Sequence, residues 1–174
     1  MAGKADFTPE EWWLLKETPL RVGAAVMVAA PSGKSGTMRE IVANATTLAN
    51  ASRAFPDSDL IKALTTPEDD AAAYKPPSLE MGDANRQARN DRVKKDALDM
   101  CRRVADVLDG KVTAEQAREY KQWVMQVGGD VARAAEEGGL MRIGAKRVSV
   151  PEVEMLKETA AALRYAEYAP PAVG

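Results

Sequence analysis

Apolar residues recur every three or four positions along much of this chain, which is the spacing of one face of an α-helix. The pattern is continuous over 38–55, 93–107, 117–134 and 153–163. It predicts long helices over about 38–55 and 83–108, and two more that begin after Thr113 and after Ser149. Short helices are expected over 59–64 and 66–74. No stretch alternates between apolar and polar residues as a half-buried β-strand would.

Four helix starts carry the same signal, a Ser or Thr followed three residues later by Glu or Gln. The pairs are Thr8 with Glu11, Thr37 with Glu40, Thr113 with Gln116, and Ser149 with Glu152. In such a capping box each side chain bonds the backbone amide of the other residue, and a cap contributes about 1 kcal/mol. The boxes therefore predict where these four helices begin.

The densest apolar run, from Val22 to Ala30, predicts the centre of the fold. Its many alanines favour helix over strand, and Pro19 is expected to end or bend the helix that Thr8 caps. Gly23 marks a place where another helix comes close. We expect an all-α fold: a compact bundle of six to eight helices built from helical hairpins, with the central apolar helix at about 20–30. A single helical domain should span 1–174, with a frayed tail at 169–174.

The overall charge and the cysteine content narrow the class of protein. The chain has 24 basic and 26 acidic residues, and a net charge of −2 provides no field that would attract nucleic acid or an anionic membrane. The longest apolar run is far shorter than the roughly 20 residues that span a bilayer. The single cysteine, Cys101, cannot form an internal disulfide, which favours a reducing compartment and a buried, inert thiol. These features predict a cytoplasmic protein without a membrane partner.

The chain contains no histidine. Histidine is the commonest general base and the commonest transition-metal ligand, so serine–histidine catalysis, cysteine–histidine catalysis and ordinary zinc sites are excluded. We therefore expect a protein without a cofactor and, on balance, without catalytic activity. Carboxylate chemistry, lysine chemistry and the binding of hard cations remain open.

The turn PSGKSG at 31–36 resembles the phosphate-binding loop of nucleotide kinases, because it joins an apolar run to a helix start. That motif requires a glycine, four residues, and then Gly-Lys-Ser or Gly-Lys-Thr. With Gly33-Lys34-Ser35 at the end of the motif, the first glycine falls on Val28, and a shifted register fails at the lysine. Nucleotide binding is therefore a remote alternative to a simple interhelical turn.

Acidic residues suggest one further kind of site, for a divalent cation. A calcium-loop pattern that begins at Asp57 fails because Lys62 stands where the loop requires glycine. Asp106 and Asp109, or the acidic pair at 69–70, could hold Mg²⁺ or Ca²⁺. Solvated helix faces and helix caps are the more ordinary roles for such residues.

Two stretches are candidates for surfaces that contact a partner. Trp12 and Trp13 lie side by side near the N-terminus, and the helix that carries them either covers the core or touches another protein. The basic residues at 86, 89, 92 and 95 wind halfway round the 83–108 helix and form no single stripe. Nucleic-acid binding is therefore unlikely, and the segment from Arg86 to Arg103 is either a binding surface or only solvated.

The alternation of alanine-rich helix, glycine turn and Ser/Thr-x-x-Glu start resembles the TerB-type bacterial helical proteins. The residues that carry the resemblance are Ala24–Ala30 with Gly33 and Thr37-x-x-Glu40, Asp109-Gly110 with Thr113, and Ala134-Ala135 with Gly138 and Ser149-x-x-Glu152. The resemblance implies a compact helical bundle linked to stress or signalling, with cation binding at Asp-Gly turns. Among the glycine turns of this chain, only Asp109-Gly110 has an aspartate before the glycine.

These observations lead to ranked hypotheses for function. The first is a non-enzymatic protein that acts through contacts with another protein or through homo-oligomerisation, with Trp12 and Trp13 as contact residues. The alternative is a helical bundle that binds a divalent cation, at Asp106 and Asp109, or a small apolar ligand in a cavity between helices. Nucleotide binding at the PSGKSG turn is the remote third.

Overall fold

The computed structural model describes residues 3–30, 44–66, 85–136 and 148–172. These residues form an all-α bundle, as predicted, and none of them lies in a β-strand. The elements are η1 (Lys4–Asp6), α1 (Pro9–Ala29), α3 (Ala51–Ala54), α4 (Asp59–Thr65), α5 (Arg86–Lys111), α6 (Ala114–Glu136) and α7 (Val150–Ala162), and residues 44–49 are also helical. Within the described ranges, no helix combines the length and the apolar character needed to cross a bilayer.

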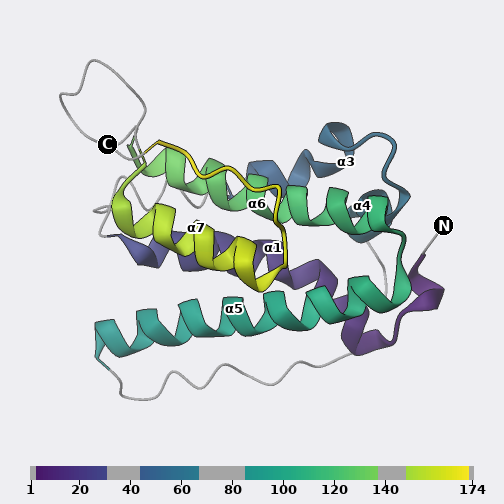
Figure 1. Ribbon diagram of the computed structural model, residues 1–174, viewed down its shortest axis with the longest axis horizontal. Coiled ribbons are helices and arrows are strands. Elements are labelled where there is room, and N and C mark those ends of the chain that lie inside the picture. The colour runs from purple at the N-terminus through teal and green to yellow at the C-terminus, as the bar shows by residue number, and fades with distance from the viewer. Residues whose placement is uncertain (1–2, 31–43, 67–84, 137–147, 173–174) are drawn as a thin grey trace.

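Helix α1 occupies the centre of the bundle, which confirms the prediction of a central apolar helix. In Figure 1 it lies behind α7, with α6 above and α5 below, and its main contacts are with α5 and α6. Leu15, Val22, Ala25 and Val26 of α1 have no exposed surface. Although α5 and α6 follow one another in the chain, they contact each other little, because α1 separates the two arms of that hairpin.

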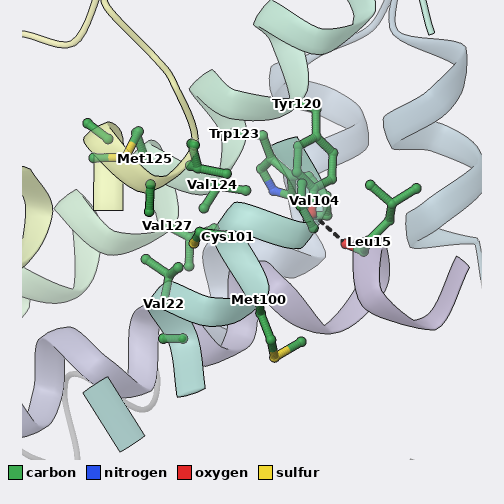
Figure 2. Packing of buried hydrophobic residues seen from close by; sticks show 14 of the residues in the cluster. Leu15, Val22, Met100, Cys101, Val104, Tyr120, Trp123, Val124, Met125 and Val127 are labelled. Atoms are coloured by element: carbon green, nitrogen blue, oxygen red, sulfur yellow. Dashed lines mark hydrogen bonds between the residues drawn. The ribbon is translucent and has the colours of Figure 1, made fainter. Parts of the chain in front are cut away.

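The proline in α1 does not divide it into two helices. We expected Pro19 to end or bend the first helix; it does not end it, because α1 continues from Pro9 to Ala29 with Pro19 buried inside it. Proline has no amide hydrogen, so the carbonyl of Leu15, four residues earlier, loses its partner within the helix. The hydroxyl of Tyr120 on α6 donates to that carbonyl at 2.8 Å (Figure 2). A tertiary hydrogen bond thus replaces the missing helical one.

The three predicted capping boxes that lie within the described residues all form. The Thr8 amide donates to Glu11 at 2.7 Å and the Glu11 amide donates to the Thr8 hydroxyl at 3.2 Å. The reciprocal bonds of Thr113 with Gln116 are both 3.2 Å. Ser149 and Glu152 form the third box, at the start of α7. These local contacts explain why the starts of α1, α6 and α7 match the sequence pattern.

Two helices differ from their predicted extents. Helix α5 continues past the expected stop at Asp109-Gly110 to Lys111. Lys111 forms an ion pair with Glu11 at 2.6 Å. This contact joins α5 to α1, and the sequence near Lys111 does not predict it. The helix expected over 38–55 is interrupted within its described part at Asn50, which has φ −95° and ψ 2° before α3 begins. Asparagine is a poor helix former that readily adopts this conformation.

Glycines in α1 and α6 mark close packing. A Cβ built on Gly23 would lie 2.5 Å from the side-chain amide of Asn44, which is buried and donates to the Leu20 carbonyl at 3.4 Å. The expected close approach at Gly23 is therefore present, with the 44–49 segment as the neighbour. A Cβ on Gly128 of α6 would lie 2.8 Å from Leu156 of α7. A side chain at either position would force its neighbour to move.

Several predicted features lie outside the described residues. They are the PSGKSG turn at 31–36, the Thr37 capping box, the short helix at 66–74 with its acidic pair, and the glycine turn at 138–139. Residues 169–172 of the predicted tail have no regular secondary structure. The hypotheses that rest on the other segments stay predictions.

Candidate functional site

The two predicted contact residues, Trp12 and Trp13, differ in how far they are buried. Trp12 is 4% exposed and belongs to the hydrophobic core, where its ring packs against Phe7 with centroids 5.7 Å apart. This pair is the hydrophobic staple that typically accompanies a capping box. Trp13 is partly buried and packs against the same core. This placement favours a structural role for Trp12 and leaves only part of Trp13 at the surface.

The predicted cation ligands, Asp106 and Asp109, lie close together on α5 and share one basic partner. The guanidinium of Arg164 donates to Asp106 at 2.6 Å and to Asp109 at 2.7 Å. These hydrogen bonds, chiefly the one to Asp106, raise the pKa of Arg164. Among the residues that the structure describes, no three acidic or cysteine side chains converge as a metal site would require. The two aspartates thus link α5 to Arg164, just after the C-terminal end of α7.

Arg164 also ends helix α7 in an unusual way. Its φ of 53° lies in the left-handed region that glycine normally occupies after a helix. The Arg164 amide donates to the Ala161 carbonyl at 3.0 Å and the Tyr165 amide to the Ala160 carbonyl at 2.9 Å. These two bonds form a Schellman motif. The sequence has no glycine here to signal this turn. Tertiary contacts stabilise it instead, among them a hydrogen bond that Lys121 of α6 donates to the Arg164 carbonyl at 3.4 Å.

The single thiol offers no reactive site. Cys101 on α5 has no exposed surface, and burial raises the pKa of its thiol to about 12. Because the thiolate is the nucleophilic form, such a cysteine is inert at neutral pH. The structure therefore agrees with the buried, unreactive role that the apolar pattern around Cys101 predicts.

The basic first half of α5 is exposed. Arg86, Arg89, Arg92 and Lys95 are all at the surface, as expected for a segment with almost no apolar residues. Arg86 lies eighteen residues before Val104, which is five helical turns, so both lie on one face of α5. Val104 is completely buried. The face of α5 that forms the core further along thus carries an exposed arginine at its start.

A pocket between the 46–54 segment and α6 gathers polar side chains that the sequence analysis did not single out. Its volume is about 200 Å³, and its walls are Thr46, Thr47, Asn50, Ala51, Ala54, Trp123, Gln126 and Asp130. On α6, Trp123, Gln126 and Asp130 share a face because they are spaced by three and four residues. The opposite wall comes from the turn at Asn50 and the residues around it.

Asp130 joins the two walls of this pocket. The Thr47 hydroxyl donates to Asp130 Oδ2 at 2.8 Å, across 83 positions of sequence. Arg133 forms an ion pair with Asp130 Oδ1. The side chain of Asp130 is 28% exposed, so its carboxylate is partly withdrawn from water while its charge is balanced by Arg133. The pocket therefore contains a carboxylate whose charge is already compensated.

Trp123 is the largest side chain on the pocket wall. It is 2% exposed and packs edge-on against Tyr120, with ring centroids 5.7 Å apart (Figure 2). Its indole N–H is buried and has no hydrogen-bond partner within the part of the chain that the structure describes. A buried donor without a partner costs about 1–3 kcal/mol, and it commonly marks the place of a bound water or ligand.

A second, more open groove lies between the start of α7, the end of α1 and α5. Its volume is about 350 Å³, and Ala29, Val150, Pro151 and Met155 form most of its wall. Lys94 at its edge is paired with Asp91 at 2.9 Å. The other two polar residues of its wall, Glu154 and Glu158, are exposed. The α6 pocket is therefore the candidate functional site.

No local signal in the sequence identifies this pocket. Thr46, Thr47 and Asn50 belong to an ordinary helical stretch, and Gln126 and Asp130 are isolated polar residues in the apolar pattern of α6. The only available hint is that Asp130 follows Gly128-Gly129, next to the buried Val131. Comparisons with protein-family models, with curated proteins and with solved structures found no match to this chain.

Proposed function

We propose that this protein is a non-catalytic helical bundle that binds a small ligand in the pocket between residues 46–54 and α6. The observation that carries the proposal is the convergence of hydroxyl, amide and carboxylate groups beside the buried indole of Trp123. Pockets that bind small molecules typically combine an apolar wall with a few placed polar groups. The absence of histidine and the inert Cys101 support a binding role over catalysis.

This proposal develops the alternative hypothesis of a ligand-binding bundle and changes the expected ligand. An apolar ligand would leave the polar groups of the wall without partners, which is unfavourable. A cation at Asp106 and Asp109 would have to displace Arg164, which already binds both carboxylates. Cation binding there is therefore the weaker proposal.

The test is a thermal-shift screen of the purified protein with a broad library of charged and neutral metabolites. At a ligand concentration a hundredfold above Kd, binding stabilises the fold by about 2.7 kcal/mol. For a chain of this length that raises Tm by about 5–10 °C. Gln126→Ala should reduce the shift, whereas Gln122→Ala, one turn away on α6 and outside the pocket wall, should not. A library without a single hit, or equal effects of the two variants, would refute the proposal.

A second candidate function is self-association through the exposed start of α5. It is supported by Arg86, which is exposed on a face that is buried further along the helix. Sedimentation equilibrium should detect an oligomer that the double variant Arg86→Glu with Arg89→Glu weakens. The double variant Lys157→Glu with Arg118→Glu makes the same charge change at exposed positions of α7 and α6 and is the control. A strict monomer at high protein concentration would contradict this candidate.

Two further expectations remain proposals. One is the relation to TerB-type proteins, which rests on the sequence pattern together with the all-α bundle. The other is the cytoplasmic location, which rests on the single cysteine and on the composition of the chain. Localisation of a tagged full-length chain by fluorescence microscopy tests the second.

A further inference from the structure

The polar groups of the α6 pocket share one chemical property, which narrows the class of ligand. The hydroxyl of Thr46 and the side-chain amides of Asn50 and Gln126 each offer both donors and acceptors. The Thr47 hydroxyl donates to Asp130 and can still accept a hydrogen bond. A ligand satisfies such a wall best when its own groups also donate and accept. Hydroxyl groups do both from a single atom, whereas ammonium groups only donate and carboxylates only accept.

The charges around the pocket disfavour an ionic ligand. Among the described residues that line the pocket, Asp130 is the only charged one, and Arg133 already pairs with it. A cation would have to displace Arg133 from the carboxylate, and an anion would meet Asp130 directly. Either ion would lose hydration without gaining an unpaired opposite charge, which is costly. An uncharged ligand avoids both penalties and can still donate a hydrogen bond to a remaining lone pair of the carboxylate.

The size of the pocket and the apolar part of its wall also suit an uncharged ligand. A pocket of about 200 Å³ admits only a small ligand. Trp123, Ala51 and Ala54 provide an apolar portion that the C–H groups of a ligand can cover.

We infer that the pocket takes an uncharged, hydroxyl-rich molecule of about the size of a monosaccharide. This inference rests on the proposed function and specifies its ligand. Asp130 accepts a hydroxyl hydrogen of the ligand, and the amides of Asn50 and Gln126 donate to and accept from neighbouring hydroxyls.

The test compares three molecules of nearly equal size: glucose, glucosamine and gluconate. Glucosamine is used at about pH 6, where its amine is protonated and the carboxylate of gluconate is ionised. Because polyols stabilise any fold by exclusion from its surface, binding is measured by titration calorimetry at millimolar concentrations, with the Tm used only to check folding. Ribitol and glycerol are included as smaller neutral probes. We expect at least one neutral probe to bind about tenfold more tightly than either charged one.

Asp130→Asn should weaken binding of that neutral probe about tenfold, because a hydrogen bond to a charged acceptor is lost. Asp99→Asn is a matched control, since Asp99 forms the same i,i+3 ion pair, with Arg102, on the exposed face of α5. Gln126→Ala, at an exposed position of the wall, provides a second site variant if Asp130→Asn folds poorly. Equal affinities of the Asp130 and Asp99 variants would overturn the inference.

The outcomes separate this inference from the function on which it rests. If glucosamine or gluconate binds more tightly than every neutral probe, the ligand class is wrong while the ligand-binding function stands. If no probe binds but charged metabolites of the broad library do, the conclusion is the same. If neither the probes nor the library bind, both the inference and the proposed function fall.

Discussion

The hydrogen bond between Tyr120 and Leu15 allows a sharp test of how α1 tolerates an internal proline. The Leu15 carbonyl lies in a residue without exposed surface and has no helical donor, because residue 19 is proline. Tyr120, which is also fully buried, donates to it at 2.8 Å. Burial raises the pKa of Tyr120 well above its usual value, so the hydroxyl keeps its proton at all ordinary pH values.

The perturbation is Tyr120→Phe, which removes the hydroxyl and leaves the aromatic ring in place. The Leu15 carbonyl then becomes a buried acceptor without a partner, which costs about 1–3 kcal/mol. In a Pro19→Ala background the new amide of residue 19 can donate to the same carbonyl. The cost of Tyr120→Phe should then fall to about 0.5–1 kcal/mol, the value of an ordinary hydrogen bond with both partners otherwise satisfied.

The assay is a double-mutant cycle measured by urea unfolding at 25 °C, with the free energy of unfolding of all four proteins obtained from the same fit. Pro19→Ala alone also changes the entropy of the unfolded chain, but that effect cancels in the coupling energy. A coupling of about 1–2 kcal/mol is expected, with Tyr120→Phe less damaging in the Pro19→Ala background. Tyr165→Phe, at a partly buried position after α7, should change stability by less than about 0.5 kcal/mol.

Equal costs of Tyr120→Phe in the two backgrounds would refute the reasoning. The hydroxyl would then stabilise the fold independently of the missing amide, for instance through the neighbouring Thr18, whose own hydroxyl donates to the Leu14 carbonyl at 2.7 Å. A larger cost in the Pro19→Ala background would contradict it as well. Coupling below about 0.5 kcal/mol counts as none.

Three further predictions concern other parts of the bundle. Arg164→Gly removes the strain of a left-handed residue and also removes two exposed ion pairs. Its free energy of unfolding should therefore stay within about 0.5 kcal/mol of the wild-type value or exceed it. That of Arg164→Ala should be about 1 kcal/mol below that of Arg164→Gly. Gly110→Ala should stabilise the protein by about 0.5–1 kcal/mol, because no described atom lies near the added Cβ. Gly128→Ala should destabilise it by about 1–3 kcal/mol, because the added Cβ clashes with Leu156. Thermal and urea unfolding of all four variants check these predictions. Cys101 should resist alkylation in the native state. Because its pKa is raised from 9.0 to about 12, its contribution to stability is complete below pH 9.0 and is lost as the pH rises to about 12, which unfolding curves across that range would detect.

Most helix boundaries could be predicted because they depend on contacts within a few residues. Thr8 with Glu11 and Thr113 with Gln116 form bonds across three positions, and their partners are visible in the sequence itself. The three-and-four spacing of apolar residues likewise depends only on helix geometry. The end of α7 was harder to predict, because Arg164 occupies a conformation that glycine usually signals. Its compensating partners, Asp106 and Asp109, are more than fifty positions away.

The candidate site could not be predicted, because none of its walls is complete in one segment. Thr47 and Asp130 are 83 positions apart and meet only when the 44–49 segment packs against the bundle. The residues that the pattern did favour, Trp12 and the pair at 106 and 109, turn out to be a staple in the core and the partners of an arginine. A polar residue has the same appearance in a sequence whether it faces water or a pocket.

The sequence by itself determined that this protein is an all-α bundle, where most of its helices start, and that its apolar segment near the N-terminus is central. Those properties follow from side-chain periodicity and capping, which are local. Only the tertiary structure decided that α1 continues through Pro19 and lies between α5 and α6, and that polar groups from distant segments line one pocket beside Trp123. The physical reason is that a missing backbone donor, or a pocket wall, can be supplied by any residue that packing brings within hydrogen-bond distance, however far away it lies in the chain.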